Sequence, residues 1–92
     1  MGLLEVGQLV TSKQGRDLGR KYVVIGCSDQ SFVHLADGLS RTVERPKRKN
    51  IRHLVAHKAR LEAPLEDKNI RAFIQQHSAE ENQGEEGSTS DG

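Results

Sequence analysis

Aromatic residues are scarce in this sequence, which has one Tyr, two Phe and no Trp among 92 residues. Peptide-binding grooves and methyl-lysine cages are built from several aromatic side chains, so the scarcity argues against such sites. Recognition of unpaired RNA bases also relies on aromatic platforms. We therefore expect little base-specific reading from this chain.

Cysteine and long apolar segments are also lacking. The single cysteine, Cys27, has no partner for an intrachain disulfide and suits a reducing, cytoplasmic compartment. No apolar run approaches about 20 residues, so we expect no membrane-spanning segment. The first residues, MGLLEVGQLV, do not have the basic region of a secretory signal.

Motifs for catalysis and cofactor binding are missing as well. The sequence has no nucleophile elbow, no Gly-Lys-Ser/Thr of a Walker-type loop and no clear Ser/His/Asp spacing. His53 and His57 could share a metal with Cys27, but this set lacks the paired cysteines of a zinc site. A chain this short also buries too modest a core for a deep cleft. We expect no enzymatic activity, no metal and no cofactor.

Charge is abundant and unevenly distributed. Residues 1–60 carry twelve Lys and Arg against five Asp and Glu, a net charge of +7. Residues 61–92 carry two against eight, a net charge of −6. A basic body with an acidic end indicates a polyanionic partner for the body.

Residues 5–45 have the composition of short antiparallel strands, which indicates a mainly β chain forming a small barrel. The segments VGQLVTS, KYVVIGCS and SFVHLADG are rich in β-branched and apolar residues and are separated by polar breaks. Asp37-Gly38 predicts a tight hairpin turn into a fourth strand, LSRTVER. That strand should end at about Arg45, because Pro46 cannot donate to a ladder.

The rest of the chain divides into three parts. Residues 53–62 could form either a last strand or a short helix. Asp67 is a good N-cap, and it precedes a short amphipathic stripe of Ile70, Phe73, Ile74 and His77. Residues 78–92 contain one apolar residue and are expected to be a disordered acidic tail. The expected units are a barrel domain at 1–62, a helix at 63–77 and the tail at 78–92.

A basic loop that contains glycines lies within residues 6–26, VGQLVTSKQGRDLGRKYVVIG. Gly15 and Gly19 allow tight turns with positive φ and let a phosphate approach the backbone closely. The loop also carries cations that can bind phosphate oxygens, namely Lys13, Arg16, Arg20 and Lys21. It serves either as a phosphate site or as a plain turn with solvated basic side chains.

A second basic run, VERPKRKNIRHL, occupies residues 43–54. Pro46 restricts the backbone before it, and Ile51 and Leu54 can anchor it to a core. We predict that this run and the glycine loop form the two halves of one polyanion-binding face.

The order of these segments resembles the KOW-motif proteins, in the ribosomal-protein-like group that includes a large-subunit protein of eukaryotic and archaeal ribosomes and small bacterial relatives. The resemblance covers roughly residues 5–55 through GQLVTSKQGRDLGRKYVVIG, a turn at Asp29, FVHLADG and RPKRKNIRHL. Gly19 falls where the KOW pattern has its near-obligatory glycine. Leu18 departs from the pattern, because a basic residue is common there.

The resemblance implies an SH3-like β-barrel that binds RNA, usually ribosomal RNA, in the ribosome or in translation-related complexes. We expect a cytoplasmic protein that is a monomer in isolation and that contacts phosphates and RNA shape. The implied RNA-binding residues are Lys13, Gly15, Arg16, Gly19, Arg20, Lys21, Arg41, Arg45, Lys47, Arg48, Lys49 and Arg52.

Two other functions stay open. SH3-like and Tudor-like folds also bind peptides, although this chain has few aromatic residues for such a site. KOW modules also occur in transcription elongation factors, where they contact polymerase or nascent RNA.

Overall fold

Five strands form one antiparallel sheet, and one helix follows it. The computed structural model describes the backbone of residues 4–89 and the side chains of residues 4–78. The sheet has the order β4-β3-β2-β1-β5. Helix α1 (Asp67–Thr89) comes last, and the 3-10 helix η1 (Ile51–His53) links β4 to β5. The expectation of a mainly β chain with a helix after the strands is confirmed. The strands are β1 (Gln8–Ser12), β2 (Lys21–Cys27), β3 (Phe32–Ala36), β4 (Lys47–Asn50) and β5 (Leu54–Arg60).

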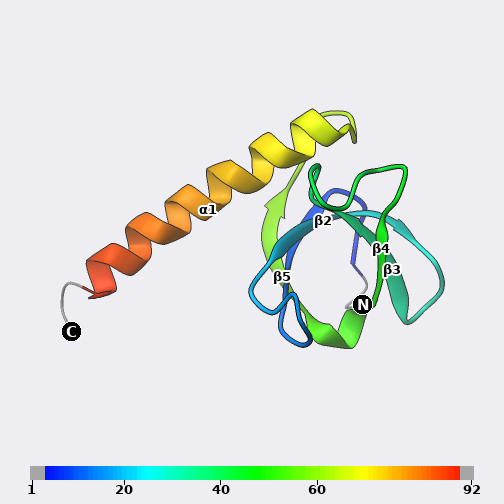
Figure 1. Ribbon diagram of the computed structural model, residues 1–92, viewed down its shortest axis with the longest axis horizontal. Coiled ribbons are helices and arrows are strands. Elements are labelled where there is room, and N and C mark those ends of the chain that lie inside the picture. Colours follow the sequence, from blue (N-terminus) through cyan, green and yellow to red (C-terminus); the bar gives the residue numbers. More distant parts are fainter. Residues whose placement is uncertain (1–3, 90–92) are drawn as a thin grey trace.

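The sheet curves around a core (Figure 1), but it does not close into a barrel. β5 pairs with β1 and β4 pairs with β3, so β4 and β5 are the two edges of the described sheet. The three residues of η1 turn the chain from one edge strand into the other, and β5 then runs along β1 instead of back along β4. The prediction of a closed barrel is therefore wrong in this respect.

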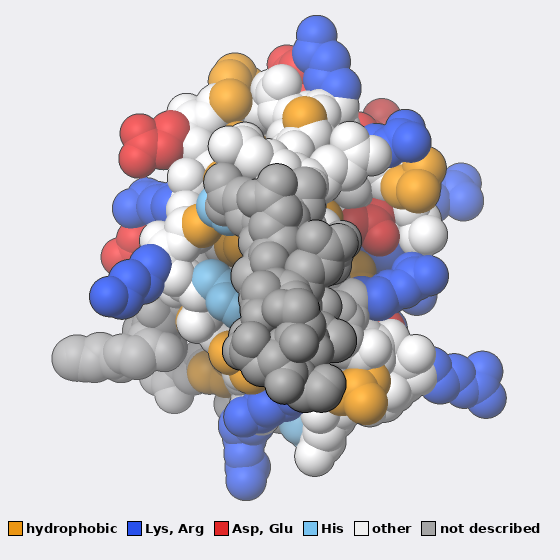
Figure 2. All heavy atoms as spheres, turned by 90° about the vertical axis from the view of Figure 1, so that its left-hand side faces the viewer, with side chains coloured by type: hydrophobic (Ala, Val, Ile, Leu, Met, Phe, Trp, Pro, Cys, Tyr) orange, Lys and Arg blue, Asp and Glu red, His pale blue; other side chains and the backbone are white. Residues whose placement is uncertain are grey.

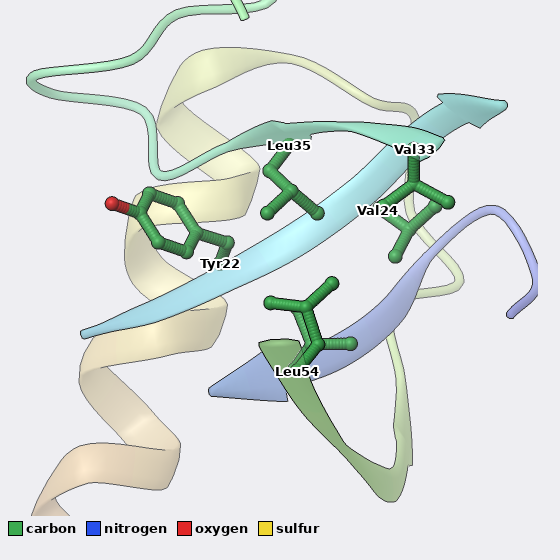
Figure 3. Close-up of a cluster of buried hydrophobic side chains, with 6 residues drawn as sticks. Tyr22, Val24, Val33, Leu35 and Leu54 are labelled. Atoms are coloured by element: carbon green, nitrogen blue, oxygen red, sulfur yellow. The ribbon is translucent and has the colours of Figure 1, made fainter. Parts of the chain in front are cut away.

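The core follows the two-residue period of the strands. Tyr22 and Val24 point inward and pack with Val33, Leu35 and Leu54 (Figure 3). The Tyr22 ring lies in this cluster, while its hydroxyl points away from the aliphatic side chains. A second cluster forms on the opposite face of the sheet, where Val23 and Ala36 meet Ile70 of α1.

Helix α1 is attached to the sheet by its first turns. Ile70 is fully buried, and Phe73 and Ile74 pack beside it, which confirms the predicted apolar stripe. Asp67 begins the helix, but its Oδ1 accepts a hydrogen bond of 2.9 Å from the backbone N–H of Val43. The carboxylate that we expected to cap the helix therefore ties down the loop before β4.

The helix is longer than the sequence predicted. It runs to Thr89 and projects away from the sheet (Figure 1), so residues 78–89 are helical where a disordered tail was expected. Residues 90–92 of that tail lie outside the described residues. The expectation rested on the lack of apolar side chains, which limits docking, whereas a helix propagates through its own backbone hydrogen bonds. Within the described backbone, no helix combines the length and apolarity needed to cross a membrane.

The connection between β3 and β4 also differs from the prediction. Of the two expected turn residues, Gly38 has a positive φ, +80°, and Asp37 does not, so Asp37-Gly38 is not the expected two-residue hairpin turn. Asp37 instead accepts hydrogen bonds from the N–H groups of Leu39 and Arg41, both at 2.8 Å. The fourth strand begins after Pro46 instead of ending before it. A residue that lacks an N–H fits just outside either end of a ladder, so the proline alone could not place the strand.

The ambiguous segment 53–62 is settled by the structure. It contains the end of η1 and all of β5, and therefore forms a strand. Val10 opposite Ala56 and Thr11 opposite Val55 place that strand on the free side of β1.

We expect Ile70→Ala to lower the free energy of unfolding by about 2–4 kcal/mol, because it leaves a cavity between α1 and the sheet. Urea denaturation followed by circular dichroism measures this change. Gln76→Ala changes an exposed position of the same helix and should shift stability by less than about 0.5 kcal/mol. Equal stability of the Ile70 variant and the parent would contradict a docked α1.

Candidate nucleic-acid interface

The loop between β1 and β2 is closed by backbone hydrogen bonds and by two glycines. The Gly19 N–H donates to the Ser12 carbonyl at 2.8 Å, and the Ser12 N–H donates to the Arg20 carbonyl at 2.9 Å. Gly15 and Gly19 have φ values of +92° and +89°, which side chains rarely allow. A Cβ on Gly19 would meet no atom within 4 Å, so that glycine is required for its backbone conformation and not for close packing.

A carboxylate that the sequence analysis did not single out lies at the centre of this loop. One oxygen of Asp17 is 2.9 Å from Lys49 Nζ and 2.9 Å from Ser12 Oγ. The other accepts a 2.9 Å hydrogen bond from the Tyr22 hydroxyl. The Asp17 and Lys49 side chains are only 11% and 10% exposed, so this ion pair is largely withdrawn from water.

The surroundings of Asp17 keep it ionised. Burial alone would raise the pKa of its carboxyl, but hydrogen bonds from Lys49, Ser12 and Tyr22 outweigh burial and hold that pKa well below its usual range. Burial and the hydrogen bond to Asp17 raise the pKa of Tyr22 to about 12. At neutral pH Asp17 is therefore a carboxylate and Tyr22 a neutral donor.

The loop and the basic run meet around one open hollow of about 620 Å³. Lys49 links the two segments directly, because its ammonium also donates to the Gln14 carbonyl at 2.8 Å. The lining contains five cations and one acidic side chain, together with two hydroxyls. It consists of Gly15, Arg16, Asp17, Arg20, Tyr22, Ser40, Arg41, Lys47 and Lys49.

Six of the twelve sequence-predicted residues line this hollow: Gly15, Arg16 and Arg20 from the loop, Lys47 and Lys49 from the basic run, and Arg41 from the segment before that run. The other six do not line it: Lys13, Gly19, Lys21, Arg45, Arg48 and Arg52. Lys21 lines a neighbouring hollow with Arg20 and with Arg71 of α1. Arg71 was not predicted, because only the fold brings the helix beside the loop.

The three consecutive cations of β4 do not share one surface. Lys47 and Lys49 pair with Leu35 and Val33, on the face that carries the inner core. Arg48 pairs with His34 on the opposite face, and its Cζ lies 3.9 Å from the Phe32 ring centroid. A strand alternates its side chains between faces, so a run that looks uniform in sequence is divided in space.

The remaining basic residues are distributed more widely. Figure 2 shows Lys and Arg side chains spread around the face from which α1 projects, with fewer acidic ones among them. Lys13 and Arg52 are exposed, and the backbone of Lys13 donates to the His53 carbonyl at 2.9 Å. Leu18, the departure from the KOW pattern, is 66% exposed and is not part of the hollow's lining.

One of the two histidines considered as metal ligands, His57, contacts a neighbouring strand through its ring. His57 Nε2 is 2.6 Å from Thr11 Oγ1, and this contact joins β5 to β1. Among the described side chains, His, Cys, Asp and Glu form no group of three that could hold a metal.

The described residues thus form a small, mainly β domain with a cationic hollow between a glycine loop and an edge strand. No model of a protein family matches the chain. The chain is 32% identical over 54 residues to the large ribosomal subunit protein eL14 of Staphylothermus marinus, covering 59% of this chain and 56% of the relative. It is 36% identical over 52 residues to eL14 of Aeropyrum pernix, covering 56% and 52%. The chain therefore spans about half the length of the curated relatives it matches.

We expect Asp17→Asn to lower the free energy of unfolding at neutral pH by about 2–4 kcal/mol, because it leaves the Lys49 ammonium without its carboxylate. The pKa of Asp17 is lower in the folded than in the unfolded chain, so its stabilisation is complete above the unfolded value of about 4 and declines as pH falls below it. The advantage of the parent over the variant should therefore shrink in acid. Urea denaturation at a series of pH values measures this.

Glu5→Gln is the matched control, since it removes the carboxylate of an exposed ion pair with Arg60. It should cost less than about 1 kcal/mol and show little dependence on pH. If the two variants behaved alike, the Asp17 cluster would have no special structural role.

Proposed function

We propose that this chain is an RNA-binding protein associated with the ribosome or with translation, and that it binds RNA phosphates in the cationic hollow. The observation that carries the proposal is the meeting of the glycine loop and the β4 run around one hollow. The similarity to eL14 proteins, which are named as components of the large ribosomal subunit, supports the ribosomal assignment.

The contacts within the hollow divide the cations into two roles. Arg16, Arg20 and Arg41 are exposed, and an arginine can grip two phosphate oxygens at once. Lys49 is committed to Asp17, so we assign it to holding the loop against β4 and not to binding RNA. Lys47 Nζ is 3.8 Å from Asp17 and its side chain is 26% exposed, so it can contact both Asp17 and an RNA phosphate.

We further propose that the curved sheet is a KOW-type, SH3-like module formed within residues 1–62. The strand order and the 3-10 turn between β4 and β5 support this proposal. The exposed cations outside the hollow would extend the RNA contact surface: Lys13, Arg45, Arg48 and Arg52. In this function the protein is a non-enzymatic, cytoplasmic RNA partner that needs no cofactor and is a monomer in isolation.

A peptide-binding role is less compatible with the structure. Tyr22 is buried in the core, the Phe32 ring lies under Arg48, and Phe73 packs between α1 and the sheet. These three aromatic side chains lie on separate elements and do not build a cage or a groove.

We expect the double variant Arg16→Gln/Arg41→Gln to bind an RNA hairpin about tenfold or more weakly, since two phosphate contacts are lost. The slope of log affinity against log salt should also become shallower by about 0.7–0.9 for each lost contact. Filter binding or fluorescence anisotropy over a range of salt concentrations measures both quantities.

Lys58→Gln/Lys68→Gln is the control, because it removes two exposed charges that do not line the hollow. It should leave most of the affinity and the slope intact. Equal losses in both double variants would mean that overall charge, and not the hollow, drives binding. Replacing Lys47, Arg48 and Lys49 together is a poorer test, since it also removes the partner of Asp17.

We expect the tagged full chain to co-sediment with ribosomal particles in a sucrose gradient at moderate salt. The Arg16→Gln/Arg41→Gln variant should shift toward the top of the gradient. If the parent chain binds RNA in isolation but stays at the top of the gradient, the chain binds RNA without associating with the ribosome.

A further inference from the structure

We propose that Arg48, supported by Phe32, is a stacking platform for one unpaired base of the bound RNA. This inference rests on the proposed RNA-binding function and adds to it a preference for single-stranded over duplex RNA. It concerns the face of β4 opposite the one on which Lys47 and Lys49 reach the hollow.

The guanidinium of Arg48 is positioned from two directions. Its Cζ lies over the Phe32 ring, 3.9 Å from the centroid, and Nη2 is 3.9 Å from Asp29 Oδ2. Asp29 is itself fixed, because its Oδ1 accepts hydrogen bonds from the N–H groups of Ser31 and Phe32 at 2.8 and 3.1 Å. The Arg48 side chain nevertheless remains 56% exposed. The group is therefore oriented without being enclosed.

An oriented, exposed guanidinium is suited to stacking. It is planar, delocalised and weakly hydrated, and in RNA complexes such planes stack on unpaired bases. The Phe32 ring attracts the cation through its π electrons and restrains the long side chain. Less conformational entropy is then lost when a base binds, because the side chain is already ordered.

The surface connects this platform to the hollow. A concavity lined by Phe32, Lys47, Arg48, Lys49, Asn50 and His53 lies at β4 and shares Lys47 and Lys49 with the hollow. β4 is an edge of the described sheet, so no described strand pairs with its outer side. An RNA strand with a phosphate near Lys47 can cross the edge and lay a neighbouring base on Arg48. A base within a duplex cannot do so, since both of its faces are covered by its neighbours.

The test compares two probes, a single-stranded oligoadenylate that carries one 2-aminopurine and a fully paired RNA duplex. Arg48→Lys keeps the charge but removes the planar group. We expect it to weaken single-strand binding about tenfold, in line with the loss of one stacked base, and to leave duplex binding unchanged. The change in 2-aminopurine fluorescence that the parent causes on binding should be smaller with the variant.

Arg60→Lys is the matched control, because it makes the same chemical change at an exposed arginine of β5, the other edge strand, where the guanidinium pairs with Glu5. This control should change the binding of neither probe. Phe32→Leu, checked for folding by thermal denaturation, removes the support under Arg48 and should reproduce the single-strand defect in part.

A failure of the stacking platform can be distinguished from a failure of the proposed function. If the parent binds RNA with salt-sensitive affinity but Arg48→Lys affects neither probe, or both equally, the stacking platform is overturned and the proposed function stands. If the parent binds neither probe at low salt, the proposed function fails and the platform fails with it.

Discussion

The Asp17 carboxylate is the contact on which the arrangement of the candidate site depends. It joins three strands, because Ser12 ends β1, Tyr22 lies in β2 and Lys49 comes from β4. A carboxylate placed in a basic, partly buried region would be costly without such partners, but with them its pKa falls and it stays charged. The glycine loop is thereby held against the edge strand. Together with the hydrogen bonds from Lys49 to Gln14 and from Lys13 to His53, this contact fixes the two basic segments relative to each other.

This contact also changes how the basic residues are interpreted. A count of cations treats Lys49 as one more phosphate ligand, yet its ammonium is directed at Asp17 and at the Gln14 carbonyl. The arginines around it remain exposed and are the residues that we propose for RNA. Arg48 leaves the hollow altogether and rests on Phe32. Neighbours in the sequence therefore serve as a structural anchor, a proposed phosphate contact and a proposed stacking group.

Several elements could be predicted from the sequence because local sequence patterns determine them. β-branched runs at strand length predicted β1, β2 and β3, and the helical spacing from Ile70 to Ile74 predicted the docked face of α1. The prediction of other elements failed where a local sequence rule allows two outcomes. Pro46 fits before a strand as well as after one, and Asp37-Gly38 can turn a loop without forming a hairpin. The length of α1 was underestimated because the lack of apolar residues was taken as a lack of helix. Closure into a barrel depends on whether the two edge strands meet, which no local pattern encodes.

The sequence by itself determined that a small β domain carries a basic loop with two glycines and a second basic run, since composition, periodicity and turn chemistry are local properties. Only the tertiary structure decided that the two segments border one hollow, that Asp17 pairs there with Lys49, that Arg71 of α1 lies near the loop, and that Arg48 lies on the opposite face of β4. The physical reason is that residues 17 and 49 are far apart in the sequence and meet only because β2 and β3 place β4 beside the loop. Alternation along β4 then sends Lys47 and Lys49 to one face and Arg48 to the other, so the chemistry of each cation follows from the sheet and not from its neighbours in the chain.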